Sequence, residues 1–306
     1  MGNVVLKPTR IPPRNSRSSF DSPRTPRRRK SGRFWKGALV TVGAMLLAVF
    51  LVKASDTFRP PGNNLLAGVG GSTKEARCPD DMVYVSDPNG GFCIDRYEAS
   101  AGKLCPVSDP GNQFDTTNNL SQKLCTPVSV QNAYPWTNVP ESQSVELCAR
   151  VGKHLPSNSE WYRAALGTPD EADESGKGCV LGRIGASHSE KTGTHEACVS
   201  SFGVYDMVGN VWEWIDANVV DGSYAARTLP DEGYVSEVDI DGVAIKTSTS
   251  TSEIFHGDTL SLNRVGVMGM FRGGFWNMTD KAGTVAINAA SAPSFTGIAV
   301  GFRCAR

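Results

Sequence analysis

The sequence predicts an α+β domain with little regular secondary structure, preceded by one transmembrane helix. Three observations support this prediction. An uncharged apolar run occupies residues 37–52. Two short β-type runs flank a strong turn signal, and two helix signals follow within a chain that is otherwise rich in Gly and polar residues. With 40% hydrophobic and 20% charged residues, the chain has the composition of a globular protein.

Residues 1–33 form a basic tail with few large apolar residues, so this segment cannot collapse around a core, and we expect it to be disordered. Residues 1–36 contain eleven Lys or Arg and a single acid, Asp21, whereas the rest of the chain has 20 basic and 30 acidic residues. A basic tail can bind nucleic acid, but this one ends just before the apolar run. We therefore expect it to fix the orientation of a membrane anchor, with no nucleic-acid partner.

Residues 34–54 are expected to anchor the chain in the membrane. The uncharged run of 16 residues is shorter than the ~20 residues of a typical span, but the stems of the flanking Lys36 and Lys53 can extend toward the two interfaces. The positive side then stays in the cytoplasm and the chain after Ala54 is exported. A cleaved signal peptide is the alternative, because small residues suit a cleavage site near Ala54. A buried soluble helix has little support, because the run has no polar face.

Residues 55–77 are rich in Gly, Pro and Asn and are expected to be a linker, so the folded domain is placed at residues 78–306. All eight cysteines fall in this exported part, where disulfides persist, and their even number suits full pairing. No CxxC motif occurs, and the four His residues show no metal-ligand spacing with the cysteines. Structural disulfides are therefore favoured over a zinc or redox site.

The domain opens with a predicted β-hairpin. Residues 82–86 and 92–100 are short β-type runs, and the sequence Asp-Pro-Asn-Gly-Gly at 87–91 between them is a strong turn signal.

Two helices are predicted next. The first covers residues 145–151 and ends at Gly152. The second begins at Ser157, because the side chains of Ser157 and Glu160 can cap each other's backbone amides. In that helix Trp161, Ala164 and Ala165 share one face.

The stretch GVYDMVGNVWEWI at residues 203–215 contains two Gly, two Trp, an Asn and two acids. Two Gly residues disfavour a helix, and the stretch lacks the alternation of an ordinary strand, so it predicts irregular backbone held in one shape by something specific. A long polar excursion follows to about residue 265. Its sequence KTSTSTSE at 246–253 predicts a loop or an edge ribbon.

Several motifs in a fixed order resemble the formylglycine-generating enzyme family, also called sulfatase-modifying factors. No single motif is specific, but the series covers about residues 78–306. The resemblance implies a compact α+β domain related to the C-type lectin fold, with bound calcium. The motifs are DMVYVSDPNGGFCIDRYEAS (81–100), YPWTNVPESQSVELCARVG (134–152), GKHLPSNSEWYRAA (152–165), YDMVGNVWEW (205–214), FRGGFW (271–276) and GFRCAR (301–306).

In that family the segment matching YDMVGNVWEW wraps a calcium ion. The resemblance therefore assigns calcium ligands to the carboxylates of Asp206 and Glu213 and to the main-chain carbonyls of Gly209 and Val211. Such oxygen ligands suit a hard cation. Without the resemblance, a packed aromatic corner with two exposed acids would be the preferred interpretation. A second calcium site, common in the family, has no clear counterpart here.

The catalytic part of the family pattern is missing. The active oxidases bind copper through two Cys residues, and the matching positions in this chain are Met278 and Gly283. One thioether beside a Gly does not replace two thiolates for a cuprous ion. The family's Ser after Gly-Gly is Phe275, and residues 284–293 lack the Arg residues of the corresponding strand. We therefore expect no catalytic residues, and neither copper nor iron as cofactor.

The resemblance also implies a disulfide pairing. The family joins the helix before GKHLP to the terminal GFRCAR motif, which corresponds to Cys148 and Cys304. The remaining cysteines then pair with their nearest neighbours, as Cys78–Cys93, Cys105–Cys125 and Cys179–Cys198.

The expected function is a membrane-anchored, non-catalytic and calcium-stabilised binding module for a peptide, a glycan or a partner protein. It is expected in a bacterial cell envelope, with the N-terminus cytoplasmic and the domain periplasmic or extracellular. A divergent family enzyme that oxidatively modifies an exported protein or peptide is one alternative. A purely structural envelope protein is another.

Overall fold

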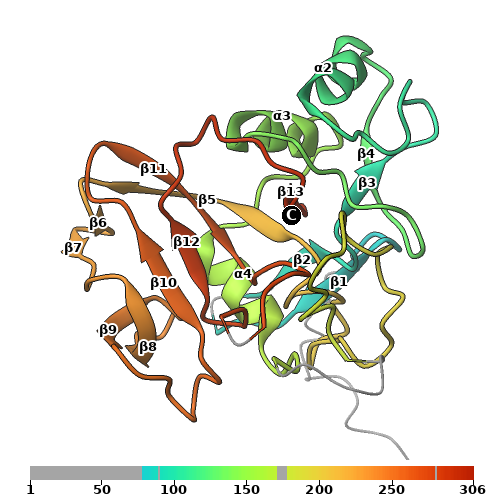
Figure 1. Cartoon of the computed structure of the whole chain (residues 1–306). Helices are drawn as coiled ribbons and strands as arrows, with labels where there is room; N and C mark the ends of the chain where they lie inside the picture. Colours follow the sequence, from blue (N-terminus) through green and yellow to red (C-terminus); the bar gives the residue numbers. More distant parts are fainter. Residues whose placement is uncertain (1–77, 89, 171–177, 280) are drawn as a thin grey trace, which may run out of the picture. The chain divides into compact units, whose positions relative to one another are not determined.

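The computed structural model describes residues 78–88, 90–170, 178–279 and 281–306 (Figure 1). They belong to the second of two compact units into which the chain divides, Thr73–Arg306. The predicted basic tail, membrane anchor 34–54 and linker 55–77 lie outside the described residues. Within the described part, no helix has both the length and the apolar character needed to span a bilayer.

Both helices and strands are present, as the α+β prediction requires, and strands predominate, which was not predicted. The described part contains three α-helices among thirteen short strands. In chain order the elements are β1 (Met82–Val85), β2 (Phe92–Asp95), β3 (Ala99–Ala101), α2 (Gln113–Ser121), β4 (Pro127–Ser129), α3 (Glu141–Arg150), α4 (Asn158–Ala165), β5 (Trp212–Val220), β6 (Ser223–Tyr224), β7 (Arg227–Thr228), β8 (Gly233–Val238), β9 (Ala244–Ser248), β10 (Thr259–Leu262), β11 (Val267–Arg272), β12 (Ile287–Ala289) and β13 (Val300–Phe302).

A nine-stranded sheet forms the centre of the domain (Figure 1). Its order is β7-β6-β5-β11-β12-β10-β8-β9, and β13 pairs with β5. The pairs β10–β12 and β5–β13 are parallel, whereas β5–β11 and β8–β9 are antiparallel. Strands β6 to β10 lie in the region predicted as a polar excursion, so that region is more regular than expected. Its predicted edge ribbon is confirmed in part, because β9 is an edge strand that ends at Ser248.

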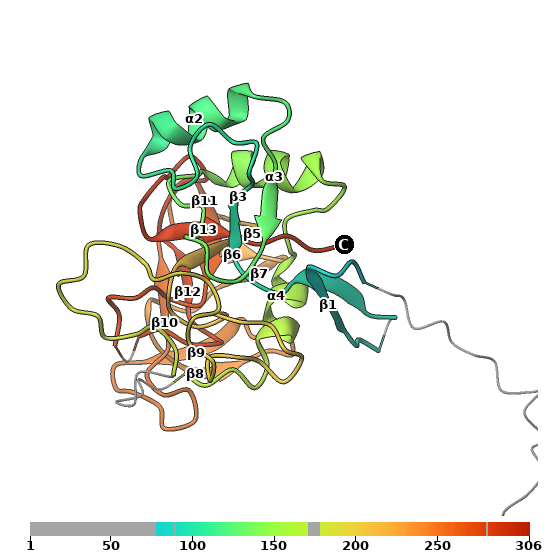
Figure 2. The ribbon, with the colours of Figure 1, turned by 90° about the vertical axis from the view of Figure 1, so that its right-hand side faces the viewer.

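The predicted hairpin is confirmed, since β1 and β2 pair antiparallel from Met82–Asp95 to Val85–Phe92. It lies next to α4 (Figure 2), where Arg163 Nε contacts Asp87 Oδ2 at 2.6 Å. The last residues of the predicted run 92–100 form a separate strand, β3, which pairs with β4.

Two of the three described helices were predicted from the sequence, with different accuracy at their ends. The predicted capping box is present in α4, where Ser157 and Glu160 cap each other, and Trp161 of that helix is fully buried. Helix α3 ends before Gly152 as predicted but begins at Glu141, four residues before the predicted start. Helix α2 was not predicted. It lies beside α3 at one end of the domain (Figures 1 and 2).

The two largest of four buried hydrophobic clusters fill most of the described interior. The larger one packs Trp161 of α4 against Ile215 of β5 and Met270 of β11. The second surrounds Trp136 and Trp214, both fully buried. Strand β5 contributes to both clusters, so the motif residues that precede it are held at the junction of the two.

All eight cysteines pair in the structure, and the four predicted disulfides are confirmed. Cys93 lies in β2 and Cys148 in α3, and the other six cysteines lie outside the named helices and strands. The pairs are Cys78–Cys93, Cys105–Cys125, Cys148–Cys304 and Cys179–Cys198.

Candidate functional site

The motif segment 203–211 has an irregular backbone, as predicted, but the prediction is wrong for the residues from Trp212 onward, which belong to β5. Asp206, Gly209 and Asn210 all have positive φ, at 58°, 77° and 48°. At Gly209 a Cβ atom would lie 2.4 Å from the carbonyl oxygen of Val180, so only Gly fits this close approach. The segment is thus fixed by backbone contacts.

A buried cluster of charges surrounds this segment. Glu98, Asp206, Glu213 and Arg303 are each at most 2% exposed. Arg303 donates from Nε to Glu213 Oε2 at 2.7 Å and from Nη2 to Glu213 Oε1 at 2.6 Å. Trp161 Nε1 also donates to Glu213 Oε2, at 2.7 Å. Arg303 therefore pairs directly with Glu213, and it also interacts electrostatically with Glu98 and Asp206.

The other two carboxylates accept hydrogen bonds from neutral groups. Glu98 accepts from Asn210 Nδ2 at 2.7 Å, and Asp206 accepts from the backbone N–H of Gly193 at 2.6 Å. Burial raises the pKa of Glu98 well above its usual range, and Asp206 and Glu213 raise it further. Burial likewise raises the pKa of Asp206 to about 6. Without a further cation, these two carboxyls are therefore driven toward the neutral form.

The charge of the whole acidic cluster, with Glu98 included, would suit a calcium ion, whereas the predicted ligand set of Asp206 and Glu213 does not match one in geometry. If all three carboxylates ionise, the cluster carries two negative charges beyond the one that Arg303 balances, which matches one divalent cation. Glu213, however, commits both oxygens to Arg303 and Trp161, so the structure gives it a different set of partners from the expected one. The described residues contain no group of three or more His, Cys, Asp or Glu arranged to hold a metal ion.

Met278 and Gly283, which the resemblance matched to the family's copper-binding Cys pair, both make close packing contacts. Met278 donates its backbone N–H to Phe275 and accepts from Gly182 N–H, and its side chain packs beside the Cys179–Cys198 cluster. A Cβ atom at Gly283 would lie 2.0 Å from Asp258 Oδ1. The carboxylate of Asp258 thus occupies the space that a side chain at position 283 would need.

Asp258 is fully buried and caps the chain beyond Gly283. Its Oδ2 accepts from the backbone N–H of Val285 at 2.8 Å, whereas its Oδ1 has no hydrogen-bond partner among the described residues. Burial raises the pKa of this carboxyl to about 7. Sequence reasoning missed Asp258, because it lies in the polar excursion, far along the chain from Gly283.

Asp258 should make the domain more stable at pH 5 than at pH 8. Its folded-state pKa of about 7 exceeds the unfolded value near 4, so the native state binds more protons between these limits and stability falls as pH rises through them. Each unit of difference corresponds to about 1.4 kcal/mol. In Asp258→Asn, the difference in melting temperature between pH 5 and pH 8 should shrink. An unchanged difference would show that Asp258 does not titrate in this range.

A pocket of about 260 Å³ lies near the motif segment. Tyr134 forms one wall, and His188 packs edge-on against it with ring centroids 5.8 Å apart. Lys191 Nζ lies 5.5 Å from the centroid of the Tyr134 ring. The lining residues are Asp109, Pro110, Gly111, Tyr134, Pro135, Thr137, His188, Ser189 and Ile298.

The motif segment holds one wall of this pocket. Asn210 Oδ1 accepts from the backbone N–H of Glu190 at 2.9 Å, and Asp206 accepts from Gly193. Between these points, Thr192 N–H donates to the carbonyl of Ala133 at 2.8 Å, which joins the His188 wall to the Tyr134 wall. The irregular segment therefore positions the pocket, which is a role that its sequence did not reveal.

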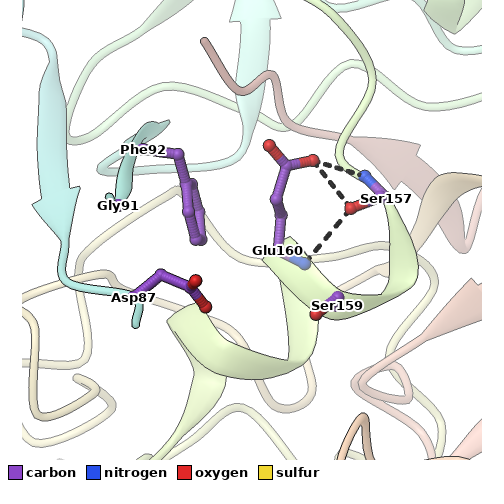
Figure 3. Close-up of a pocket in the computed structure, with 6 residues that line it drawn as sticks. All are labelled: Asp87, Gly91, Phe92, Ser157, Ser159 and Glu160. Carbon is purple, nitrogen blue, oxygen red and sulfur yellow. Dashed lines mark hydrogen bonds between the residues drawn. The ribbon is translucent and has the colours of Figure 1, made fainter. Parts of the chain in front are cut away.

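A second pocket of about 380 Å³ lies between the β1–β2 turn and the start of α4 (Figure 3). Phe92, Asp87 and Glu160 face it. Its polar groups already have partners, because Glu160 accepts from Ser157 and contacts His154 Nε2 at 3.0 Å, and Asp87 pairs with Arg163. This pocket is thus built mainly from the hydrogen bonds that cap α4.

The sequence resemblance had pointed to Asp206, Gly209, Val211, Glu213, Met278 and Gly283. It did not single out Glu98 and Arg303, although both lie within quoted motifs. No signal set these two residues apart, because the same motifs contain other charged residues such as Asp95 and Arg306.

Two of three comparisons with known proteins find similar proteins. A family model for the sulfatase-modifying factor enzyme 1-like domain matches residues 72–306. A comparison with curated proteins finds no match. Similar solved structures include PvdO from Pseudomonas aeruginosa, with 18% identity, a TM-score of 0.40, and coverage of 74% of this chain and 90% of that one.

Treponema denticola variable protein 1 is 16% identical with a TM-score of 0.41, and the match covers 71% of this chain and 84% of that one. The Major Tropism Determinant M1 variant is 17% identical with a TM-score of 0.41, and the match covers 74% of this chain. The chain spans about half the length of the Major Tropism Determinant variants, 52% in each case.

Proposed function

The chain belongs to the sulfatase-modifying factor enzyme 1-like domain family, and we propose that it is a non-catalytic binding module of the cell envelope. In this proposal the ligand is a peptide, a glycan or a partner protein, and the pocket beside Tyr134 receives part of it. Residues 34–54 anchor the chain in the membrane, with the N-terminus in the cytoplasm and the domain exported. Protease added to intact spheroplasts should then remove the domain.

One observation carries the proposal. The position of the family's second copper-binding Cys is Gly283, where the Asp258 carboxylate leaves no room even for a Cβ atom. A Cys side chain at position 283 would require Asp258 to move, which supports a chain without a two-thiolate copper site. A pocket with an aromatic wall, beside Tyr134, supports a binding role.

The experiment that tests the proposal pairs binding with turnover. The purified full-length chain is presented with peptide and glycan libraries, and oxygen uptake is recorded with the same compounds. Saturable binding that Tyr134→Ala weakens, without oxygen uptake, supports a binding module. Substrate-dependent oxygen uptake would support a divergent enzyme instead.

Calcium is part of the proposal, with Asp206 and the carbonyls of Gly209 and Val211 as ligands near the acidic cluster. The support is the charge balance, since one divalent cation would neutralise Glu98 and Asp206 together. Glu213 would then balance Arg303 and would not be a ligand in its present arrangement. In this role calcium stabilises the motif segment, and hence the pocket wall that the segment holds.

Chelation of calcium should lower the melting temperature of the full-length chain by about 5 °C or more. A ligand present at a hundredfold above its dissociation constant stabilises by about 2.7 kcal/mol if it binds only the native state. Asp206→Asn should abolish this sensitivity. The matched control Asp216→Asn removes an exposed acid from β5 and should retain it. If chelator leaves the melting curve unchanged, the motif segment holds no calcium and is a packed aromatic corner.

A further inference from the structure

The pocket beside Tyr134 is small. Its volume of about 260 Å³ is below the roughly 300–1,000 Å³ of pockets for drug-sized ligands, so it accepts one ring or one side chain. The ring of Tyr134 and the side chains of Pro110, Pro135 and Ile298 provide apolar lining. A ligand that fits must therefore present one apolar face.

The charges near the pocket balance. Asp109 is an exposed carboxylate in the lining, and Lys191 places its ammonium group over the Tyr134 ring. The neighbouring Glu190 contacts Arg183 at 3.1 Å and His195 at 2.9 Å, so its charge is already compensated. Asp109 would repel an anionic ligand, and Lys191 would repel a cationic one. The pocket therefore favours an uncharged ligand.

The polar side chains at the pocket offer several acceptors. His188 Nδ1 lies 2.7 Å from the carbonyl oxygen of Ser189. In the neutral ring Nδ1 is then assigned as the donor, which leaves Nε2 as an acceptor. The Asp109 carboxylate is an acceptor, and the Ser189 hydroxyl can donate or accept. Several acceptors around one apolar wall suit a ligand that carries several hydroxyl donors.

The pocket is also held in shape before any ligand binds. The Ala133–Thr192 hydrogen bonds join two walls, and Asn138 N–H donates to the carbonyl of Gly297 at 3.0 Å, which fixes the segment that carries Ile298. Because the walls are tied together, little ordering cost opposes the binding of a small ligand.

We infer that this pocket binds a single uncharged sugar ring, either a free sugar or the end of a glycan. The C–H face of the ring packs on Tyr134 and Ile298, and its hydroxyl groups donate to Asp109 and His188. This inference rests on the proposed function, since it takes the pocket to be the ligand site. It narrows the proposed ligand classes to a neutral saccharide.

The test is saturation-transfer NMR on the full-length chain in a detergent that carries no sugar. The uncharged probes are the methyl glycosides of glucose, galactose, mannose and N-acetylglucosamine. Methyl glucuronide and glucosamine are the charged counterparts, and maltose and lactose represent a glycan end. We expect at least one uncharged glycoside to bind more tightly than both charged sugars. If a disaccharide binds more tightly than the methyl glycoside, the natural ligand is the end of a glycan. If the two bind equally, the natural ligand is a free sugar.

Variants locate the binding. Tyr134→Ala should weaken the binding of the uncharged glycoside at least tenfold, because it removes the aromatic wall. Asp109→Asn changes an exposed side chain and is expected to fold. It should weaken that glycoside several-fold and reduce the discrimination against glucuronide. Ile240→Ala, at a side chain 84% exposed in the turn before β9, is the control and should leave binding unchanged.

Three results would overturn the inference: no response from any uncharged sugar, a preference for a charged one, or binding that survives in Tyr134→Ala. If peptides bind instead, with a loss in Tyr134→Ala, the sugar assignment fails while the binding module stands. Turnover of a substrate with oxygen uptake would contradict the binding module separately.

Discussion

Replacement of Arg303 by Met is expected to destabilise the domain by about 3–5 kcal/mol, because it leaves a buried carboxylate without its partner. Arg303 and Glu213 are 0% and 1% exposed and form a two-point ion pair, while Glu98 and Asp206 lie in the same cluster. Since domains are typically stable by only about 5–15 kcal/mol, the loss should be visible as a large drop in the midpoint of urea unfolding.

A matched control is Lys246→Met, which breaks the exposed pair between Lys246 and Glu237, whose side chains are 67% and 47% exposed. This change should cost no more than about 1 kcal/mol. Adding calcium should restore part of the stability of the Arg303 variant if the ion binds at the acidic cluster. If the Arg303 variant loses no more unfolding free energy than the Lys246 variant, the buried pair does not stabilise the domain.

The double variant Met278→Cys plus Gly283→Cys is expected to lose stability without gaining a copper site. The new Cβ atom at position 283 would lie 2.0 Å from Asp258 Oδ1, so Asp258 must move and give up its hydrogen bond to Val285. Overpacking in a core costs typically about 1–3 kcal/mol, and the loss of a buried hydrogen bond adds to this. Thermal unfolding measures the loss, and titration with cuprous ion measures binding.

Gly111→Ala is the control, because a Cβ atom there has only an ordinary contact, 3.8 Å from Asp115 Oδ2. It should shift the melting temperature little. A double-Cys variant that is as stable as the wild type and binds one cuprous ion tightly would show that the pocket can be returned to the family's arrangement. That result would contradict the claim that the Asp258 carboxylate excludes a Cys side chain at position 283.

Local signals predicted the local features well. The turn sequence at 87–91 predicted the β1–β2 hairpin, and Ser157 with Glu160 predicted the start of α4, because each signal acts within a few residues. The resemblance supplied the Cys148–Cys304 pairing, which spacing alone could not have chosen. The hairpin and the start of α4 need no knowledge of distant contacts, whereas this disulfide joins residues 156 positions apart and was predicted from the resemblance alone.

Helix α2 and several features that depend on distant contacts were missed. Helix α2 is a polar helix with little apolar periodicity, so its local Asn112 cap was the one signal for it and was overlooked. The Glu213–Arg303 pair and the contact of Asp258 with Gly283 join residues that are far apart in the chain. The pocket was missed for the same reason, since Tyr134 and His188 meet only after folding.

The most direct test of the central claim, that this family member binds without oxidising, is mass spectrometry of a sulfatase-type Cys peptide. The peptide is incubated with the full-length wild-type chain, oxygen and added copper. We expect the Cys residue to be recovered unchanged, because Met278 and Gly283 cannot supply two thiolates and Asp258 fills the second position. Conversion of the Cys residue to formylglycine by the wild-type chain, at a rate dependent on its concentration, would contradict it.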